Sequence, residues 1–263
     1  MSEPGRPPNL RGCRAKIEWA RRHFDTFKGH VDTFFAQNPY VAAVRSDPEG
    51  SRYLVRIQNP PRMPSDEWAL LIGDCVHNLR SALDYLVWEM AGADPQDRTT
   101  MFPIFIDAQR YRGDAHIRLR KAPEEVQAVI EKLQPYHTSD PAKSALWALQ
   151  VLDAADKHQL LTVTAVMPAQ GNLRFLFSGD SAPEFEVKAF NVPLSHDALV
   201  AELVFRQPTP HVDIRAEVSA DVALGESLGF GSRIGITRAF PQIIEDVERV
   251  RLYFKKAFNV SDE

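Results

Sequence analysis

The chain has 263 residues, of which 44% are apolar and 25% are charged, a composition ordinary for a globular protein of one large or two small domains. A formal net charge of −4, with no long run of one sign, makes nucleic acid a less favoured partner than a small ligand or another protein. No apolar run is long enough to span a membrane, no secretory leader is recognisable, and the two cysteines lack C-x-x-C spacing. We therefore expect no membrane partner, no disulfide framework and a reducing cytoplasm as the location.

The first part of the chain predicts two helices separated by a hairpin. Apolar residues recur at alternating spacings of three and four over residues 17–34, which predicts an amphipathic helix that ends near Gln37. Two runs of β-branched and aromatic residues flank an Asp-Pro-Glu-Gly turn and predict a β-hairpin over residues 40–58. A serine followed by two acidic residues favours a helix start, so we expect a second helix over residues 66–91.

The middle of the chain predicts a loop and two more helices. Glycines and prolines over residues 91–122 surround the short apolar run MFPIFI, which predicts a loop that contains one short strand. Pro123 opens a short helix that ends near Gln134. The next helix is expected over residues 140–160, because an Asp-Pro pair precedes apolar residues in helical register.

The remainder of the chain predicts strands followed by one helix. Four to six apolar runs, separated by glycines and prolines, predict an antiparallel β unit over residues 160–224. Apolar positions from Phe240 to Phe258 then repeat with helical spacing. A final helix is therefore expected near the end of the chain.

These elements together predict an α+β fold. We expect a helical bundle of about five helices, with an early β-hairpin and an inserted antiparallel β unit. The expected domains are a bundle formed by residues 9–160 and 232–258, which includes the hairpin, and a β unit formed by residues 161–231. Both ends of the chain would then lie in the same bundle.

The second predicted helix has an apolar stripe on one side and an unusual polar stripe on the other. The polar side carries poor helix formers where a free surface favours Ala, Glu, Lys or Gln: Asp74, His77, Asn78, Ser81, Asp84, Tyr85 and Trp88. Such a face indicates that these side chains contact other groups of the protein or a ligand. Arg80 lies between the two stripes, where it can pair with a carboxylate or with a bound anion.

A second group of polar residues lies in the segment LDAADKH, late in the helix expected over residues 140–160. Asp156 occupies a position that the apolar stripe would otherwise fill, and Asp153 lies one turn earlier. A buried aspartate needs a partner, and Arg80 or His77 is the expected one. The two polar segments would then form one network, which either fixes the register of the helices or forms a binding or active site.

The strings HNLRSALDYL and, some seventy residues later, DKH resemble those of a group of uncharacterised bacterial proteins. The resemblance covers the helical half of the chain and implies no established activity. More distantly, a helical bundle with a charged polar face resembles the HEPN superfamily, whose ribonuclease members carry Arg, four to six residues, then His.

The chain departs from this ribonuclease pattern in the second predicted helix. The positions that should hold the histidine after Arg80 hold Tyr, Leu and Val, so the resemblance implies a degenerate, noncatalytic relationship. The spacing recurs from Arg110 to His116 and from Arg206 to His211. Both segments are broken by glycine or proline, and no helix is predicted in either.

A metal site is one alternative for the polar residues. Asp74 and His77 have the spacing of the carboxylate-x-x-His unit of di-iron bundles, but a second such unit is missing. One mononuclear site formed by Asp74, His77 and Asp156 remains an alternative. His158 and Asp156 lie about 200° apart on a helix, so they can share a site only where the helix ends between them.

For function, we favour a binding or interaction module with a polar site between helices. The expected partner is a small anionic ligand or another protein, and the expected ligand-binding residues are Arg80, Asn78, Asp156 and His158. The common nucleotide, dinucleotide, hydrolase and metalloprotease motifs are absent from the sequence, so it identifies no cofactor.

Two alternatives compete with the binding module. The first is a metal-assisted hydrolase or phosphodiesterase that acts on nucleotides or RNA, with His77 as general acid or base and Asp74 and Asp84 as further catalytic candidates. The second is a purely structural polar layer. An enzyme needs these side chains in one accessible cleft, whereas a structural layer needs them saturated and dry.

Overall fold

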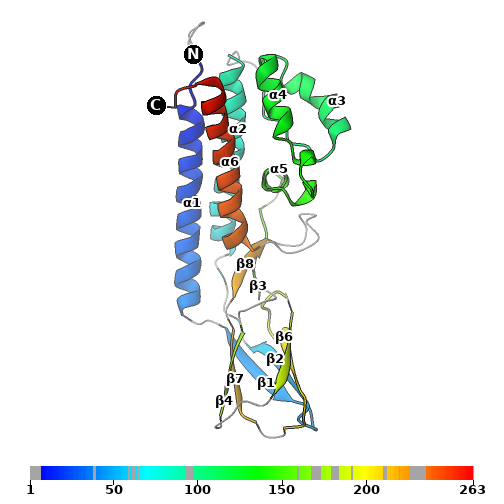
Figure 1. Ribbon diagram of the computed structural model, residues 1–263. Coiled ribbons are helices and arrows are strands. Elements are labelled where there is room, and N and C mark those ends of the chain that lie inside the picture. The colour runs from blue at the N-terminus through cyan, green and yellow to red at the C-terminus, as the bar shows by residue number, and fades with distance from the viewer. Residues whose placement is uncertain are drawn as a thin grey trace.

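The computed structural model describes residues 7–37, 40–58, 60, 63, 65–92, 98–158, 160–166, 173–178, 184–190, 192–209, 212–218, 220–224 and 235–262. This part of the chain contains six α-helices and eight strands, all of whose strand pairs are antiparallel. Figure 1 shows long helices side by side at one end of the molecule and most of the strands at the other. The fold is therefore α+β, as expected.

Three long helices, α1 (Arg11–Ala36), α2 (Ser65–Met90) and α6 (Ile236–Phe258), form the centre of the bundle (Figure 1). Each places its apolar stripe toward the other two, and aromatic rings meet where the stripes cross. Phe24 of α1 stacks on Phe240 of α6 with ring centroids 6.0 Å apart. None of the described helices combines the length and the apolar character that crossing a membrane requires.

Helix α3 (Ala108–Arg118) lies where the sequence predicted a loop with one short strand. The side chain of Asp107 caps this helix by accepting a 2.8 Å hydrogen bond from the Arg110 amide, and Tyr111 is buried in the bundle core. These two contributions outweigh the cost of one glycine, Gly113, inside the helix. Arg110 and His116 therefore do lie on a helix, contrary to the prediction, but both side chains are exposed. In the other segment with this spacing, His211 is outside the described residues.

Two shorter helices complete the bundle, α4 (Glu124–Lys132) and α5 (Ala145–Asp156). Between them are two single-turn 3₁₀ helices, η1 (Pro135–His137) and η2 (Pro141–Lys143). Helix α5 begins later than predicted because Ser144 caps it, its hydroxyl accepting a 3.2 Å hydrogen bond from Trp147 N.

The strands form one larger sheet and two pairs. The sheet has the order β1–β2–β6–β5, β4 pairs with β7, and β3 pairs with β8. The strand bounds are β1 Val41–Ser46, β2 Arg52–Gln58, β3 Val163–Val166, β4 Leu173–Phe177, β5 Phe185–Ala189, β6 Leu199–Phe205, β7 Ile214–Val218 and β8 Asp221–Leu224.

The early hairpin is part of the β end of the molecule, which differs from its expected place in the bundle. Strand β2 pairs with β6, with Tyr53 opposite Leu203. Alternate residues of β2 are buried, and a two-stranded hairpin alone cannot cover such an apolar face. Of the expected domain boundaries, 231/232 lies outside the described residues.

Two hydrophobic clusters follow from this arrangement: one joins the helices with residues of β3 and β8, and the other lies within the remaining strands and the segments beside them. Phe34 and Phe35, in the last turn of α1, pack against both clusters, as does Met63 before α2. The two ends of the molecule are therefore joined by shared apolar contacts as well as by the connecting chain.

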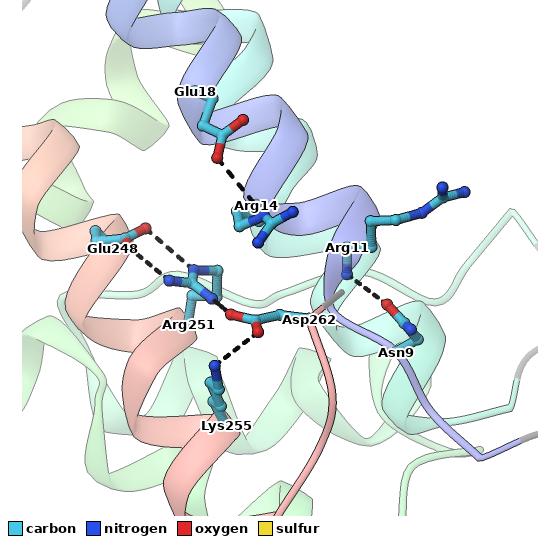
Figure 2. Close-up of polar contacts among 8 residues, drawn as sticks. All are labelled: Asn9, Arg11, Arg14, Glu18, Glu248, Arg251, Lys255 and Asp262. Carbon is cyan, nitrogen blue, oxygen red and sulfur yellow. Dashed lines mark hydrogen bonds and ion pairs between the residues drawn. The ribbon is translucent and has the colours of Figure 1, made fainter.

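The two ends of the chain meet at the far end of the bundle. Leu10 N donates a 2.7 Å hydrogen bond to Ser261 O. Figure 2 shows Arg251 of α6 between the carboxylates of Glu248 and Asp262, with Lys255 bound to Asp262 as well. The Arg251 and Asp262 side chains are both almost fully buried, so this network fixes the last residues of the chain against α6.

Candidate functional site

The sequence placed most of the candidate residues on α2, and the structure shows two different environments for them. Asp74, His77 and Tyr85 are exposed, and Ser81 and Asp84 are half-buried. The apolar stripe on the other side is buried in the core, as predicted, with its last residue half-buried: Trp68, Ile72, Cys75, Leu79, Leu83, Leu86 and Met90. Helix α2 therefore presents an outward polar face beside α5 and α1.

Arg80 is only 5% exposed and its guanidinium is directed into the protein. Its Nη2 donates hydrogen bonds to Asp84 Oδ1 at 2.7 Å and to Phe102 O at 2.6 Å. Phe102 N in turn donates to Asp84 Oδ1 at 2.9 Å. Arg80 and Asp84 thus hold the backbone C=O and N–H of one residue, Phe102, in the segment before α3, and this pairing leaves the arginine charge neutralised within the protein.

Nη1 of Arg80 is a second feature of this pair. Among the described residues it is one of two buried side-chain nitrogen or oxygen atoms without a hydrogen-bond partner, the other being Trp68 Nε1. Because Nη1 is itself covered by protein atoms, an anion from solvent does not reach it in this conformation. The structure therefore gives little support to Arg80 as an exposed anion anchor.

Asp84 differs from Arg80 because part of its carboxylate reaches a pocket. Oδ1 accepts both hydrogen bonds described above, whereas Oδ2 accepts none from the described residues. Burial raises the pKa of Asp84, against the lowering effects of the Arg80 charge and of the hydrogen bond from Phe102 N. Burial therefore still disfavours the charged form of this carboxylate, although Arg80 pairs with it.

The pocket beside Asp84 has a volume of about 350 Å³. Its described lining residues are Asp84, Tyr85, Trp88 and Thr100. One carboxylate, two aromatic rings and one hydroxyl group are the typical composition of a small-molecule site, in which few polar groups orient a ligand among apolar walls. The sequence placed Asp84, Tyr85 and Trp88 on the polar side of this helix but named only Asp84 as a candidate.

The two polar segments identified in the sequence do lie together. The α5 residue Asp156 is packed so closely against α2 that a Cβ atom on Gly73 would lie 2.5 Å from its Oδ1. Partial burial raises the pKa of Asp156, the Asp153 and Asp74 carboxylates raise it further, and His77 acts in the opposite direction. This carboxylate is therefore close to the polar face of α2, although no hydrogen bond joins it to Arg80.

The other residues of the DKH segment have separate environments. Asp153, rather than Asp156, is the buried aspartate of α5, and it pairs with Lys157 at 2.6 Å. His158 lies beyond the end of α5 and is exposed, so it does not join Asp156 in a common site. The expected ligand residues Arg80, Asn78, Asp156 and His158 therefore do not converge on one cavity.

His77, the candidate acid or base, is exposed on α2. Its nearest hydrogen-bonding side chain is Ser81, with Nε2 and Oγ 3.5 Å apart, the limit of a hydrogen bond. Within the described part of the chain, no three His, Cys, Asp or Glu side chains gather closely enough to hold a metal ion. The set of Asp74, His77 and Asp156 is therefore not arranged as a chelating group.

Asn78 faces α1 instead of the Arg80 side of α2. It is 7% exposed, and its Oδ1 accepts a 3.1 Å hydrogen bond from Lys16 Nζ while its Nδ2 donates to Asp74 O. The sequence analysis did not identify Lys16 as a candidate site residue. The one pattern that could have identified it is its position on the polar side of the first predicted helix, three residues before the exposed Trp19.

Comparisons with protein-family models, with curated proteins and with solved structures each returned no match. The site must therefore be interpreted from its own chemistry.

Proposed function

We propose that this chain is a small-molecule-binding protein whose ligand site is the pocket lined by Asp84, Tyr85, Trp88 and Thr100. The observation that carries the proposal is the Asp84 carboxylate. Arg80 and the Phe102 peptide hold one oxygen in a fixed position, and the other oxygen has no partner among the described residues. A carboxylate fixed in this way is preorganised for a ligand, because it need not lose further side-chain freedom on binding.

The carboxylate and the aromatic rings of the pocket favour an organic cation, such as an amine or a quaternary ammonium group, as the ligand. Asp153 is the further carboxylate that acts on Asp84, and it is paired with Lys157, so Asp84 supplies the charge of the pocket lining. The aromatic rings that line the pocket add to this preference, since ammonium groups are attracted to the faces of Trp and Tyr. This differs from the anion that the sequence suggested, because Arg80 is already paired.

The pKa of Asp84 gives this proposal a pH signature. Burial raises that pKa, so an empty pocket favours the neutral carboxyl group more than water does. A bound cation stabilises the charged form, and binding then releases the proton wherever the carboxyl was protonated. Affinity should therefore increase as the pH rises through the pKa of Asp84 and become constant above it.

The proposed binding site does not depend on the other predictions from the sequence. A cytoplasmic location, the resemblance to bacterial proteins and the distant resemblance to the HEPN superfamily stay predictions. So does the enzyme alternative, because His77 has only the long contact with Ser81 and lies outside the described lining of the pocket.

The test is calorimetric titration and thermal unfolding of the purified protein with choline and with linear alkylamines. We expect the wild type to bind and its midpoint to rise with ligand concentration. Asp84→Asn should weaken binding at least tenfold, because it removes the charge and retains the shape. Asp114→Asn, which makes the same change on α3 in a half-buried pair with Arg118, is the matched control and should bind as the wild type does.

A second variant guards against loss of folding in Asp84→Asn. Trp88→Leu retains an apolar side chain but removes the aromatic ring, and it should weaken choline binding more than it weakens alkylamine binding. The proposal is contradicted when the wild type binds none of these cations, or when Asp84→Asn folds and binds them as well as the wild type does.

A further inference from the structure

A second pocket lies on the other side of Tyr85, between α1 and α2. It has a volume of about 430 Å³, and its described lining residues are Gly12, Ala15, Lys16, Trp19, Asn78 and Tyr85. The side chains of Trp19 and Tyr85 are 49% and 46% exposed, which is unusual for large aromatic residues on a helix surface. Two pockets therefore adjoin one exposed tyrosine.

Lys16 gives this second pocket a positive charge. Its side chain is half-buried, and among the described residues no carboxylate forms an ion pair with it. Its one hydrogen bond goes to Asn78 Oδ1, and the Asn78 amide is fixed in turn by its bond to Asp74 O. An ammonium group has three donors, so Lys16 retains two for a ligand.

Tyr85 is held in a position from which it can serve both pockets. A Cβ atom on Gly12 would lie 3.2 Å from Tyr85 Cδ1, so the ring rests against the bare backbone of α1. The same side chain lines the pocket with Asp84 and the pocket with Lys16. A ligand that crosses Tyr85 would thus meet a carboxylate at one end and an ammonium group at the other.

We infer that the ligand is a two-ended zwitterion, with its cationic group at Asp84 and a carboxylate or phosphate at Lys16. This inference rests on the proposed function, to which it adds the anionic end. Asn78 and Asp84 are six residues apart on α2, which at about 1.5 Å per residue separates the two subsites by about 9 Å along the helix. The two charges of a ligand that fills both should be at least this far apart.

The experiment compares a series of ω-amino carboxylates with alkylamines of the same length, using calorimetry on the full chain. Aminobutanoate, aminohexanoate, aminooctanoate and aminodecanoate increase the distance between the charges step by step. We expect the carboxylate to add nothing in the short members and to improve affinity about tenfold once the ends reach both subsites. The matching alkylamines, which lack the anionic end, measure the proposed function by itself.

Lys16→Met is the informative variant, because it retains the apolar stem and removes the charge. It should abolish the advantage of the long amino carboxylates and leave alkylamine binding intact. Lys28→Met, the same change at an exposed α1 lysine paired with Asp32, should preserve the advantage.

The outcomes separate the two proposals. Both are supported when Asp84→Asn loses alkylamine binding and Lys16→Met loses the tighter binding of the long amino carboxylates relative to the matching alkylamines. Alkylamine binding with no carboxylate advantage at any length overturns the zwitterion inference and leaves the cation site in place. Failure of the wild type to bind any member of either series overturns both.

Discussion

Arg80 and Arg251 are two buried arginines that each pair with an aspartate, and the pKa of the two aspartates shifts in opposite directions. For Asp84, burial outweighs the single guanidinium of Arg80 and raises the pKa. For Asp262, hydrogen bonds from Lys255 and Arg251 outweigh burial and lower the pKa (Figure 2). A carboxylate held by two cations is therefore satisfied within the protein, whereas one held by a single cation beside a pocket still favours an additional positive charge.

The Asp262 network predicts a loss of stability in acid. A carboxyl group whose pKa is lowered in the folded state stabilises the fold above its unfolded pKa, and this stabilisation is lost as the pH falls through the folded pKa. We expect the free energy of unfolding, measured with urea, to decline as the pH is lowered below about 4. Asp262→Asn should cost about 1–3 kcal/mol at neutral pH and reduce that decline.

The matched control for this prediction is Asp32→Asn, in an exposed pair with Lys28 on α1. It should change the free energy of unfolding by less than about 1 kcal/mol and leave the acid decline intact. An Asp262→Asn protein that loses stability in acid as steeply as the wild type would contradict the assignment of this effect to Asp262.

For the candidate site, the sequence predicted which side of a helix a residue occupies better than it predicted which residue that side chain contacts. The outward positions of Asp84 and His77 follow from 100° per residue along one helix, which requires no knowledge of the rest of the chain. Arg80, in contrast, binds a carbonyl 22 residues away in a segment without regular structure, and Lys16 binds Asn78 across 62 residues. Such partners depend on tertiary packing, so periodicity alone could not identify them.

The Asp156 carboxylate of α5 lies against one glycine of α2, Gly73. Gly73 lies in the interior of α2, where alanine would be favoured by about 1 kcal/mol. A Cβ atom there would collide with Asp156, at 2.5 Å from Oδ1 and 3.0 Å from Cγ. The Asp156 carboxylate, in its observed position, therefore occupies the space that a side chain at position 73 would need.

Gly73→Ala should consequently stabilise the fold by less than the better helix propensity of alanine provides, because Asp156 must leave its position. In an Asp156→Ala background the collision is removed, and the same substitution should raise the free energy of unfolding by about 0.5–1 kcal/mol. Urea unfolding of the four proteins of this double-mutant cycle measures the coupling. Gly29→Ala on α1, where a Cβ would meet nothing within 4 Å, is the control and should be stabilising in both backgrounds.

The helices with long apolar stripes were predictable from the sequence. The elements that depend on a capping residue, or on a strand partner far along the chain, were not. Helix α1 ends within a residue or two of its predicted end, because its stripe continues without interruption over many turns. Helix α3 was missed, because its start depends on a cap from Asp107 and its burial on two residues, Tyr111 and Ala115. The place of the hairpin was missed because β6, its partner, lies about 150 residues later in the chain.

At the level of the whole molecule, the helical and β ends are connected more than once. The chain passes from helices to strands after α1, returns to α2, passes to the strands again after α5, and returns to α6 (Figure 1). Phe34 and Phe35 add apolar contacts to both clusters. A β unit formed from two separated segments, and packed in this way on the bundle, is expected to unfold together with it.

The distribution of tryptophan allows a direct test of this coupling. All four tryptophans, Trp19, Trp68, Trp88 and Trp147, lie in α1, α2 and α5, so their fluorescence reports on the helical end and, through the contact of Trp68 with Phe34, on its junction with the strands. Leu203 of β6 is fully buried in the strand cluster, and Leu203→Ala should destabilise that cluster by about 2–5 kcal/mol. When the two ends unfold as one unit, the tryptophan transition in urea shifts to lower concentration by the corresponding amount. A tryptophan transition that stays in place, while the circular dichroism of the strands is lost earlier, would show that the helical end is stable by itself.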